Sequence, residues 1–164
     1  MDAVLERARR IRLLVLDVDG VLTDGRLFIS PAGEEFKAFH VRDGSGLVAV
    51  QRAGVTVAII SGRDSAAVNR RAAELGICHT RQGVADKGAE LATLLRELGI
   101  AASETACVGD DTPDLPMLRA AGLAVAVADA HPAAKDAAHW ITPSPGGHGA
   151  VREVCDLLLS ARAR

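Results

Sequence analysis

The chain has 164 residues, 49% of them hydrophobic, and a formal net charge of -2 at pH 7. This length can bury the core of one domain, and the near-neutral charge gives no support to nucleic acid or an anionic membrane as a partner. With three Phe, one Trp and no Tyr, the sequence offers few aromatic rings on which single-stranded bases could stack.

The N-terminal segment and the cysteines predict a cytoplasmic protein. The segment MDAVLERARR at 1–10 lacks the uncharged apolar core of a signal peptide, and the later apolar runs are short and interrupted by charges, so we expect no membrane association. Cys78, Cys107 and Cys155 are widely spaced and odd in number, and each lies in an apolar segment. This pattern favours buried, reduced thiols over disulfides or a metal site.

The first third of the chain predicts a buried strand followed by an inserted hairpin. Four apolar residues at 13–16 are typical of a strand that is buried on both faces. The turn formers Pro31 and Gly33 separate two apolar segments, which predicts a β-hairpin. The predicted elements up to residue 60 are a helix over 2–10, a strand over 13–16, a hairpin over 26–41, a helix over 43–54 and a strand over 55–60.

The rest of the chain alternates helices and strands with short connections. Such alternation predicts an α/β domain over 1–164, with a Rossmann-like, doubly wound parallel sheet, a tail turn and terminal helix over 143–164, and no cap domain. The further predicted elements are helices over 65–75, 87–98, 113–121, 132–138 and 150–160, and strands over 77–79, 105–109, 123–128 and 140–142.

Polar residues follow several predicted strands directly. Asp17 and Asp19 follow the first strand, and Ser61 and Asp110 each follow a later one. Since the carboxyl ends of parallel strands meet at the edge where ligands bind, we expect these side chains to converge. Close acids repel each other unless a cation lies between them, and Mg²⁺ prefers oxygen ligands. Helix capping is the simpler alternative for such residues, but capping requires neither the DxD nor the GDDxxD spacing.

These motifs, in this order, resemble those of the haloacid dehalogenase superfamily of aspartate-nucleophile phosphatases. They are DVDGVLTDG at 17–25, SGR at 61–63, Lys87 and GDDTPD at 109–114. The segments FHVRDGSG, QGVADK, VAVADAHP and GGHGAVREVCDLLL are more narrowly similar to the family of 3-deoxy-D-manno-octulosonate 8-phosphate phosphatases, over nearly the whole chain. The resemblance implies a capless, magnesium-dependent phosphomonoesterase that acts on this sugar-acid phosphate in lipopolysaccharide biosynthesis and assembles as a homotetramer.

The resemblance also implies a role for each motif residue. Asp17 attacks phosphorus to form an aspartyl phosphate, and Asp19 protonates the leaving alkoxide and later deprotonates water. Ser61 and Lys87 bind the phosphoryl oxygens, and a lysine at a helix N-terminus is unfavourable unless an anion lies beside it. The implied magnesium ligands are the Asp17 and Asp110 carboxylates and the Asp19 carbonyl, with Asp111 and Asp114 orienting Lys87 and metal-bound water.

Arginines are available for the carboxylate end of such a substrate, since a guanidinium can bind a carboxylate through two hydrogen bonds. Val48 and His148 depart from the family, which often has a polar or basic residue at the first position and an arginine at the second. A nine-carbon sialic-type acid 9-phosphate is therefore the alternative substrate. The predicted substrate contacts are Asp19, His40, Val41, Arg42, Asp43, Gly44, Arg63, Arg71 and Lys87.

Two further functions fit parts of the sequence. Gly44 to Ala49 match the GxGxxA dinucleotide fingerprint with Asp64 downstream, although Asp43 would repel a pyrophosphate. A phospho-accepting receiver domain also uses clustered acids, magnesium and a lysine, but the hairpin and the DxD spacing disfavour it.

The histidines and the hairpin complete the predictions. His79, His131 and His139 lack the spacing of metal ligands, so we expect structural or surface roles. An isolated hairpin is marginal in water, and a neighbouring subunit can bury its apolar residues. These residues are Leu27, Phe28, Ile29, Phe36 and Phe39.

Overall fold

The computed structural model describes residues 1–163 and has a six-stranded sheet at its centre, in the order β5-β4-β1-β6-β7-β8. All of its neighbouring strands are parallel, which confirms the predicted Rossmann-like architecture. The strands are β1 (Leu13–Leu16), β4 (Thr56–Ile60), β5 (His79–Arg81), β6 (Thr105–Gly109), β7 (Leu123–Ala126) and β8 (Trp140–Ile141).

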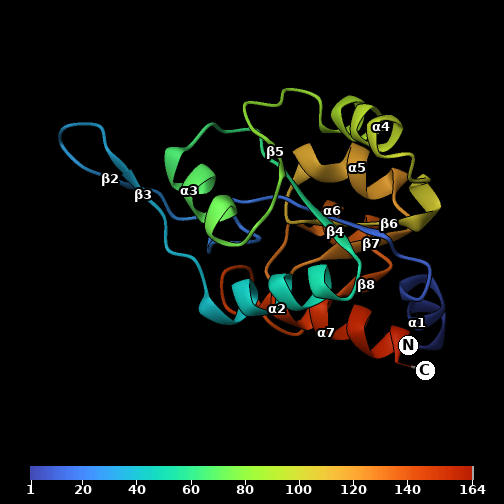
Figure 1. The fold of residues 1–164 in the computed structure, drawn as a ribbon. Coiled ribbons are helices and arrows are strands. Elements are labelled where there is room, and N and C mark those ends of the chain that lie inside the picture. The colour runs from blue at the N-terminus through green and yellow to red at the C-terminus, as the bar shows by residue number, and fades with distance from the viewer. Residues whose placement is uncertain (164) are drawn as a thin grey trace.

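Helices cover both faces of the sheet (Figure 1), as the alternating sequence pattern predicts. The helices α1, α2 and α7 pack together on one face, and α4 and α5 lie on the other. None of the described helices is long and apolar enough to cross a bilayer. Their bounds are α1 (Asp2–Ala8), α2 (Val41–Arg52), α3 (Ala66–Glu74), α4 (Lys87–Leu98), α5 (Leu115–Ala120), α6 (Pro132–Ala137) and α7 (Ala150–Arg162), with 3-10 turns at Ala102–Glu104 and Thr112–Asp114.

The central strands β1 and β6 bring the predicted acids to one edge. Every residue of β1 is fully buried, because β4 and β6 pair with it on either side and helices cover both faces of the sheet. In this register Leu16 lies beside Val108, and the Asp17 N–H donates to the Val108 carbonyl. Asp17 and Asp110 therefore lie close together at the same edge of the sheet, although they are far apart in the sequence.

The predicted hairpin is confirmed, but its strands are short. β2 (Phe28–Ile29) and β3 (Glu35–Phe36) pair antiparallel, with Phe28 opposite Phe36, and the hairpin projects away from the body (Figure 1). Phe28, Ile29 and Phe36 are 52%, 62% and 58% exposed. The insertion between β1 and α2 is limited to this hairpin, so the described residues contain no cap domain.

Several predicted boundaries shift for physical reasons. Strand β5 starts at His79 rather than at residue 77, because buried Ile77 packs in the core before the chain reaches its pairing register with β4. Helix α2 starts at Val41 because the His40 side chain caps it by accepting from the Arg42 N–H. The GxGxxA segment thus lies inside a helix instead of in a strand-to-helix loop, which removes the basis of the dinucleotide alternative.

The cysteine prediction is correct for two of the three thiols. Cys107 and Cys155 are buried and free. Cys78 is exposed, contrary to the prediction, and it lies just before β5, which is at the edge of the sheet.

Candidate active site

The predicted motif residues converge on a cleft at the carboxyl edge of the sheet. Its volume is about 270 Å³. The cleft contains the acids that follow β1, the serine that follows β4, the first residue of α4 and the acids that follow β6. The lining residues are Asp17, Asp19, Ser61, Gly62, Arg63, Lys87, Asp110, Asp111, Pro113 and Asp114.

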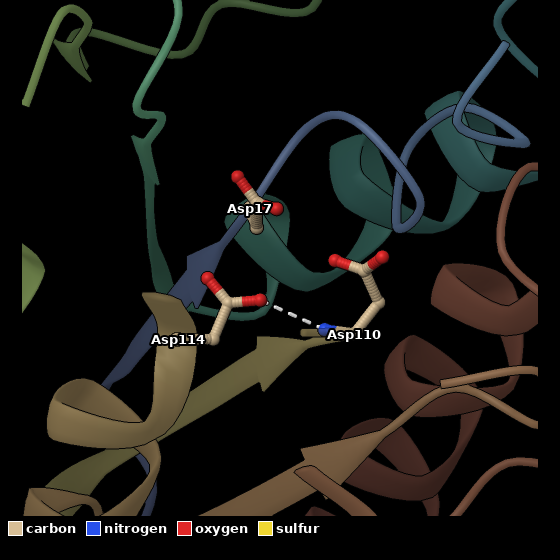
Figure 2. A group of neighbouring side chains, drawn as sticks. All are labelled: Asp17, Asp110 and Asp114. Atoms are coloured by element: carbon tan, nitrogen blue, oxygen red, sulfur yellow. Dashed lines mark hydrogen bonds between the residues drawn. The ribbon is translucent and has the colours of Figure 1, made fainter. Parts of the chain in front are cut away.

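Three carboxylates of this cleft face one another. Asp17, Asp110 and Asp114 each offer an oxygen within 4.8 Å of the others (Figure 2). Burial and the Asp114 charge raise the pKa of Asp17 to about 6, against the opposing effect of Lys87. Burial and the charges of Asp17 and Asp114 raise the pKa of Asp110 to about 8. Carboxylates this close favour a proton or a cation between them, and an all-oxygen donor set fits Mg²⁺.

Lys87 joins two of these acids from the first turn of α4. Its Nζ lies 2.8 Å from Asp17 Oδ1 and 2.6 Å from Asp114 Oδ1, and only 5% of its side chain is exposed. Burial lowers the pKa of Lys87, but the two carboxylates outweigh that effect and raise it overall. The predicted cation at this helix N-terminus is thus compensated by anions.

Asp114 is an orienting residue at the base of the cleft. It is 1% exposed, and its Oδ2 accepts hydrogen bonds from the N–H groups of Asp110 (2.8 Å) and Asp111 (3.2 Å). Figure 2 shows the hydrogen bond from the Asp110 N–H to Asp114. Because Lys87 occupies the other oxygen, Asp114 fixes both the lysine and the Asp110 backbone. The Asp111 carboxylate instead accepts from the Thr112 N–H, where it caps the short 3-10 turn.

Two glycines allow the loop after β1 to reach Asp110. Gly20 has φ +93, and a Cβ there would overlap the Asp110 carboxylate. On the other side, Gly146 of the tail turn lies against the Gly20 carbonyl, and the Gly147 N–H donates to Val21. The tail turn therefore supports the loop that carries Asp19 and Gly20.

The Asp19 carboxylate lies at the mouth of the cleft, among charged side chains. Its Oδ1 is 2.5 Å from Lys37 Nζ, and its Oδ2 is 3.7 Å from Arg63 Nε. Ser61 is 2% exposed, and its Oγ accepts from the Arg63 N–H. Lys37 and its neighbour Glu35 are not among the site residues predicted from the sequence. The signal was available, since Glu35, Phe36 and Lys37 alternate as polar, apolar and polar along a predicted strand.

Two predicted substrate residues lie outside this cleft. Asp43 is 1% exposed, and its Oδ1 accepts from the Arg152 N–H at 2.8 Å, so it caps the N-terminus of α7. Arg71 pairs with Glu74 at 3.3 Å and packs against Gly44.

The remaining predicted substrate residues lie at the start of α2. Val41 is 76% exposed, Arg42 is also exposed, and His40 caps the helix. None of these three lines the cleft. Two other histidines have structural contacts, since the Nδ1 atoms of His131 and His139 accept from backbone N–H groups.

Comparisons with known proteins agree with this geometry. Residues 80–154 match the model of a haloacid dehalogenase-like hydrolase family. The 3-deoxy-D-manno-octulosonate 8-phosphate phosphatase KdsC of Escherichia coli strain K12 is 50% identical over 161 residues, which cover 98% of this chain and 86% of that protein. The chain belongs to the 3-deoxy-D-manno-octulosonate 8-phosphate phosphatase family.

Solved structures of this family match the whole fold. The Yersinia pestis phosphatase is 48% identical, with a TM-score of 0.97 and coverage of 99% of this chain and 88% of that one. The Moraxella catarrhalis phosphatase, solved with magnesium, phosphate and KDO, is 45% identical, with a TM-score of 0.98 and coverage of 99% and 94%. As a member of the 3-deoxy-D-manno-octulosonate 8-phosphate phosphatase family, the chain is a phosphoric monoester hydrolase.

Proposed function

We propose that this protein is a magnesium-dependent phosphatase that hydrolyses 3-deoxy-D-manno-octulosonate 8-phosphate to the free sugar acid and phosphate. The observation that carries the proposal is the buried contact of Lys87 with Asp17 and Asp114, beside Asp110, in a chain 50% identical to phosphatases of that name. A receiver domain would share the acids, but it would not share this similarity over 98% of the chain.

In the first step, an oxygen of the Asp17 carboxylate attacks phosphorus. A bond forms between Asp17 and phosphorus as the bond from phosphorus to the sugar oxygen breaks, which gives an aspartyl phosphate. Lys87 holds Asp17 in place at 2.8 Å and neutralises charge on the phosphoryl oxygens. Ser61 donates a hydrogen bond to the same oxygens.

Asp19 acts as the general acid and then as the general base. It gives a proton to the departing sugar oxygen and then takes one from the water that attacks the aspartyl phosphate, which releases phosphate and restores Asp17. Its position at the mouth of the cleft, two residues after the nucleophile, supports this assignment. A carboxylate held there can reach both the leaving group and the incoming water.

The Asp17 and Asp110 carboxylates and the Asp19 carbonyl would hold Mg²⁺. The fit rests on the raised pKa values of Asp17 and Asp110, since a divalent cation relieves the repulsion that raises them. When bound, the ion supplies positive charge that orients the phosphoryl group and stabilises its transition state. Asp114 is not needed as a ligand, because its oxygens already bind Lys87 and two backbone N–H groups.

Arg63 is the predicted arginine that is placed to contact the substrate, near its phosphate end beside Asp19. It lines the cleft, and its side chain is 49% exposed. Arg71 and the residues from His40 to Gly44 do not line the cleft of their own chain, and within that segment the exposed Val41 and Arg42 could contact the substrate of a second copy. A homotetramer would supply that copy and would also cover the exposed Phe28 and Phe36.

The proposed substrate gives the protein a role in lipopolysaccharide biosynthesis, and a cytoplasmic location is predicted from the sequence. The nine-carbon acid 9-phosphate remains the competing substrate because Val48 and His148 depart from the family pattern.

Phosphate release decides between these substrates. We expect the highest kcat/KM for the eight-carbon ester, a lower value for the nine-carbon ester, and loss of both activities in EDTA with recovery on addition of Mg²⁺. A preference for the nine-carbon ester, or for a sugar phosphate without a carboxylate, would contradict the proposed substrate but would not affect the proposed phosphatase mechanism. Full turnover in EDTA would contradict the metal dependence.

A further inference from the structure

The inner side of the hairpin carries a buried cation. Side chains alternate along a strand, and Lys37, directly after β3, lies on the same side as Glu35 with its Nζ beside the Glu35 carboxylate, whereas Phe36 points to the other side. Only 1% of the Lys37 side chain is exposed, although the hairpin as a whole projects into solvent. A lysine buried to this extent needs anionic partners.

Those partners form a closed ring of four charges that includes Asp19. Lys37 Nζ lies 2.5 Å from Asp19 Oδ1 and 3.0 Å from Glu35 Oε1. Arg63 Nη2 lies 3.1 Å from the same Glu35 oxygen, and Arg63 Nε lies 3.7 Å from Asp19 Oδ2. The ring connects the loop after β1, the hairpin and the loop after β4.

The ring holds the Asp19 carboxylate, which is the proton-transfer group of the proposed mechanism. Lys87 contacts Asp17, and the Gly20 loop packs against Asp110. Within residues 1–163, the charged partners of the Asp19 carboxylate are Lys37 and Arg63 alone. Arg63 is half exposed and more distant, so Lys37 makes the closer and better shielded contact. Fixing a proton-transfer group within a fraction of an ångström affects the rate strongly.

We propose that Lys37 is a positioning residue that holds the Asp19 carboxylate where it can protonate the leaving oxygen. This inference rests on the proposed function, because it assigns Lys37 a part only through Asp19. In this proposal the hairpin segment contributes to the active site of its own chain, independently of any contact with another subunit.

Leaving-group chemistry distinguishes this role from a general structural one. An alkoxide leaves only with a proton, so cleavage of a sugar phosphate depends on Asp19. The nitrophenolate of p-nitrophenyl phosphate is stable without a proton, so its departure does not. A displaced Asp19 therefore slows release of the alkoxide more than release of the phenolate, whereas general damage to the cleft slows both equally.

The test measures leaving-group release in a single turnover, with enzyme in excess and Mg²⁺ present, for both esters. For Lys37→Met we expect a loss of about tenfold or more with 3-deoxy-D-manno-octulosonate 8-phosphate and less than about threefold with p-nitrophenyl phosphate. Lys37→Arg should recover most of the loss, because it restores the cation. Arg26→Met is the matched control, since it removes a 78% exposed hairpin cation that does not contact Asp19, and it should match the wild type.

Asp19→Asn separates failure of this inference from failure of the proposed function. If Asp19→Asn shows the selective loss and Lys37→Met loses both activities equally or neither, the positioning role is wrong and the mechanism stands. If Asp19→Asn shows no selectivity, the proton-transfer mechanism itself is wrong. Should Lys37→Met not fold by circular dichroism, Glu35→Gln removes the second Lys37 partner and should give a smaller loss with the same selectivity.

Discussion

The carboxyl edge of the sheet and the hairpin differ sharply in how their key side chains are held. At the sheet edge, the side chains of Asp17, Lys87 and Asp114 are 9%, 5% and 1% exposed and contact one another. On the hairpin, Phe28 and Phe36 are more than half exposed and contact each other across strands of two residues. The chemical groups are thus preorganised within one chain, whereas the apolar side of the hairpin is left without a partner in that chain.

This difference predicts two kinds of response to mutation. Substitutions at the sheet edge should remove the chemistry and leave the fold, because β1 and β6 remain buried. Substitutions on the outer side of the hairpin should change assembly and substrate capture, because so short a hairpin adds little stability by itself. Three variants test this contrast, and variants of Asp43 on α2 give a smaller effect.

The largest effect is expected for Asp17→Asn. An amide is a poor nucleophile and a weaker metal ligand, so kcat should fall by about 10⁴-fold or more, while the circular dichroism spectrum stays unchanged. Steady-state phosphate release by the purified protein measures this. Substantial residual activity in the folded variant would contradict the aspartyl phosphate and favour direct attack by water.

Gly20→Ala should have the next largest effect. The added Cβ overlaps the Asp110 carboxylate, so kcat/KM should fall by about 100-fold and the Mg²⁺ concentration needed for half activity should rise. Gly33→Ala is the matched control in the hairpin: its φ of +84 is similar, but nothing lies within 4 Å of the new Cβ. Equal losses in the two variants would mean that backbone strain, rather than the contact with Asp110, explains the effect.

A double substitution, Phe28→Ser with Phe36→Ser, should act mainly on assembly. We expect light scattering to give a tetramer for the wild type and smaller species for the variant, with kcat/KM lowered by about tenfold, mostly through KM. Ile141→Ser, at an exposed position on edge strand β8, is the control and should stay tetrameric. If light scattering shows that the active wild-type protein is a monomer, the proposed homotetramer is wrong.

The sequence predicted the sheet edge well because the physical signals there are local and strong. Four apolar residues identify β1, and the cap residue Asp86 with the C-terminal Gly99 delimits α4 at its predicted bounds. Parallel topology then brings Asp17 and Asp110 together without further information. Edge strand β5 was less predictable, because its residues are half-buried and its register depends on pairing with β4.

The predictions on α2 and α3 were less secure, because the direction of a side chain around a helix depends on tertiary packing. The sequence predicted substrate contacts for Asp43, from the family resemblance, and for Arg71, as an available cation, yet neither lines the cleft of its own chain. Lys37 shows the opposite case: the alternation in β3 was visible, but only the position of the hairpin relative to Asp19 gives it a meaning.

The smallest effect concerns Asp43, whose carboxylate caps α7 although the sequence suggests substrate binding. Asp43→Ala removes the acceptor for the Arg152 N–H and should lower the free energy of unfolding by about 1–2 kcal/mol in urea titrations. Asp43→Asn keeps an acceptor oxygen and should cost less than about 0.5 kcal/mol near neutral pH. If kcat/KM of folded Asp43→Asn nevertheless falls more than about tenfold, Asp43 acts on turnover beyond its cap on α7, as the sequence predicts.

The pH dependence of the same variants gives a sharper test. Burial, with a smaller contribution from the Glu153 charge, raises the pKa of Asp43, and the hydrogen bond from the Arg152 N–H and the His40 charge partly oppose this rise. A carboxyl whose pKa is raised on folding contributes stability that is complete below its unfolded pKa of about 3.9 and is lost as the pH rises through its folded pKa. Asn has no charge to bury. The free energy of unfolding of Asp43→Asn should therefore rise relative to that of the wild type as the pH increases from about 4 to neutral. If the difference in the free energy of unfolding between the two proteins stays constant across that range, folding does not raise the pKa of Asp43.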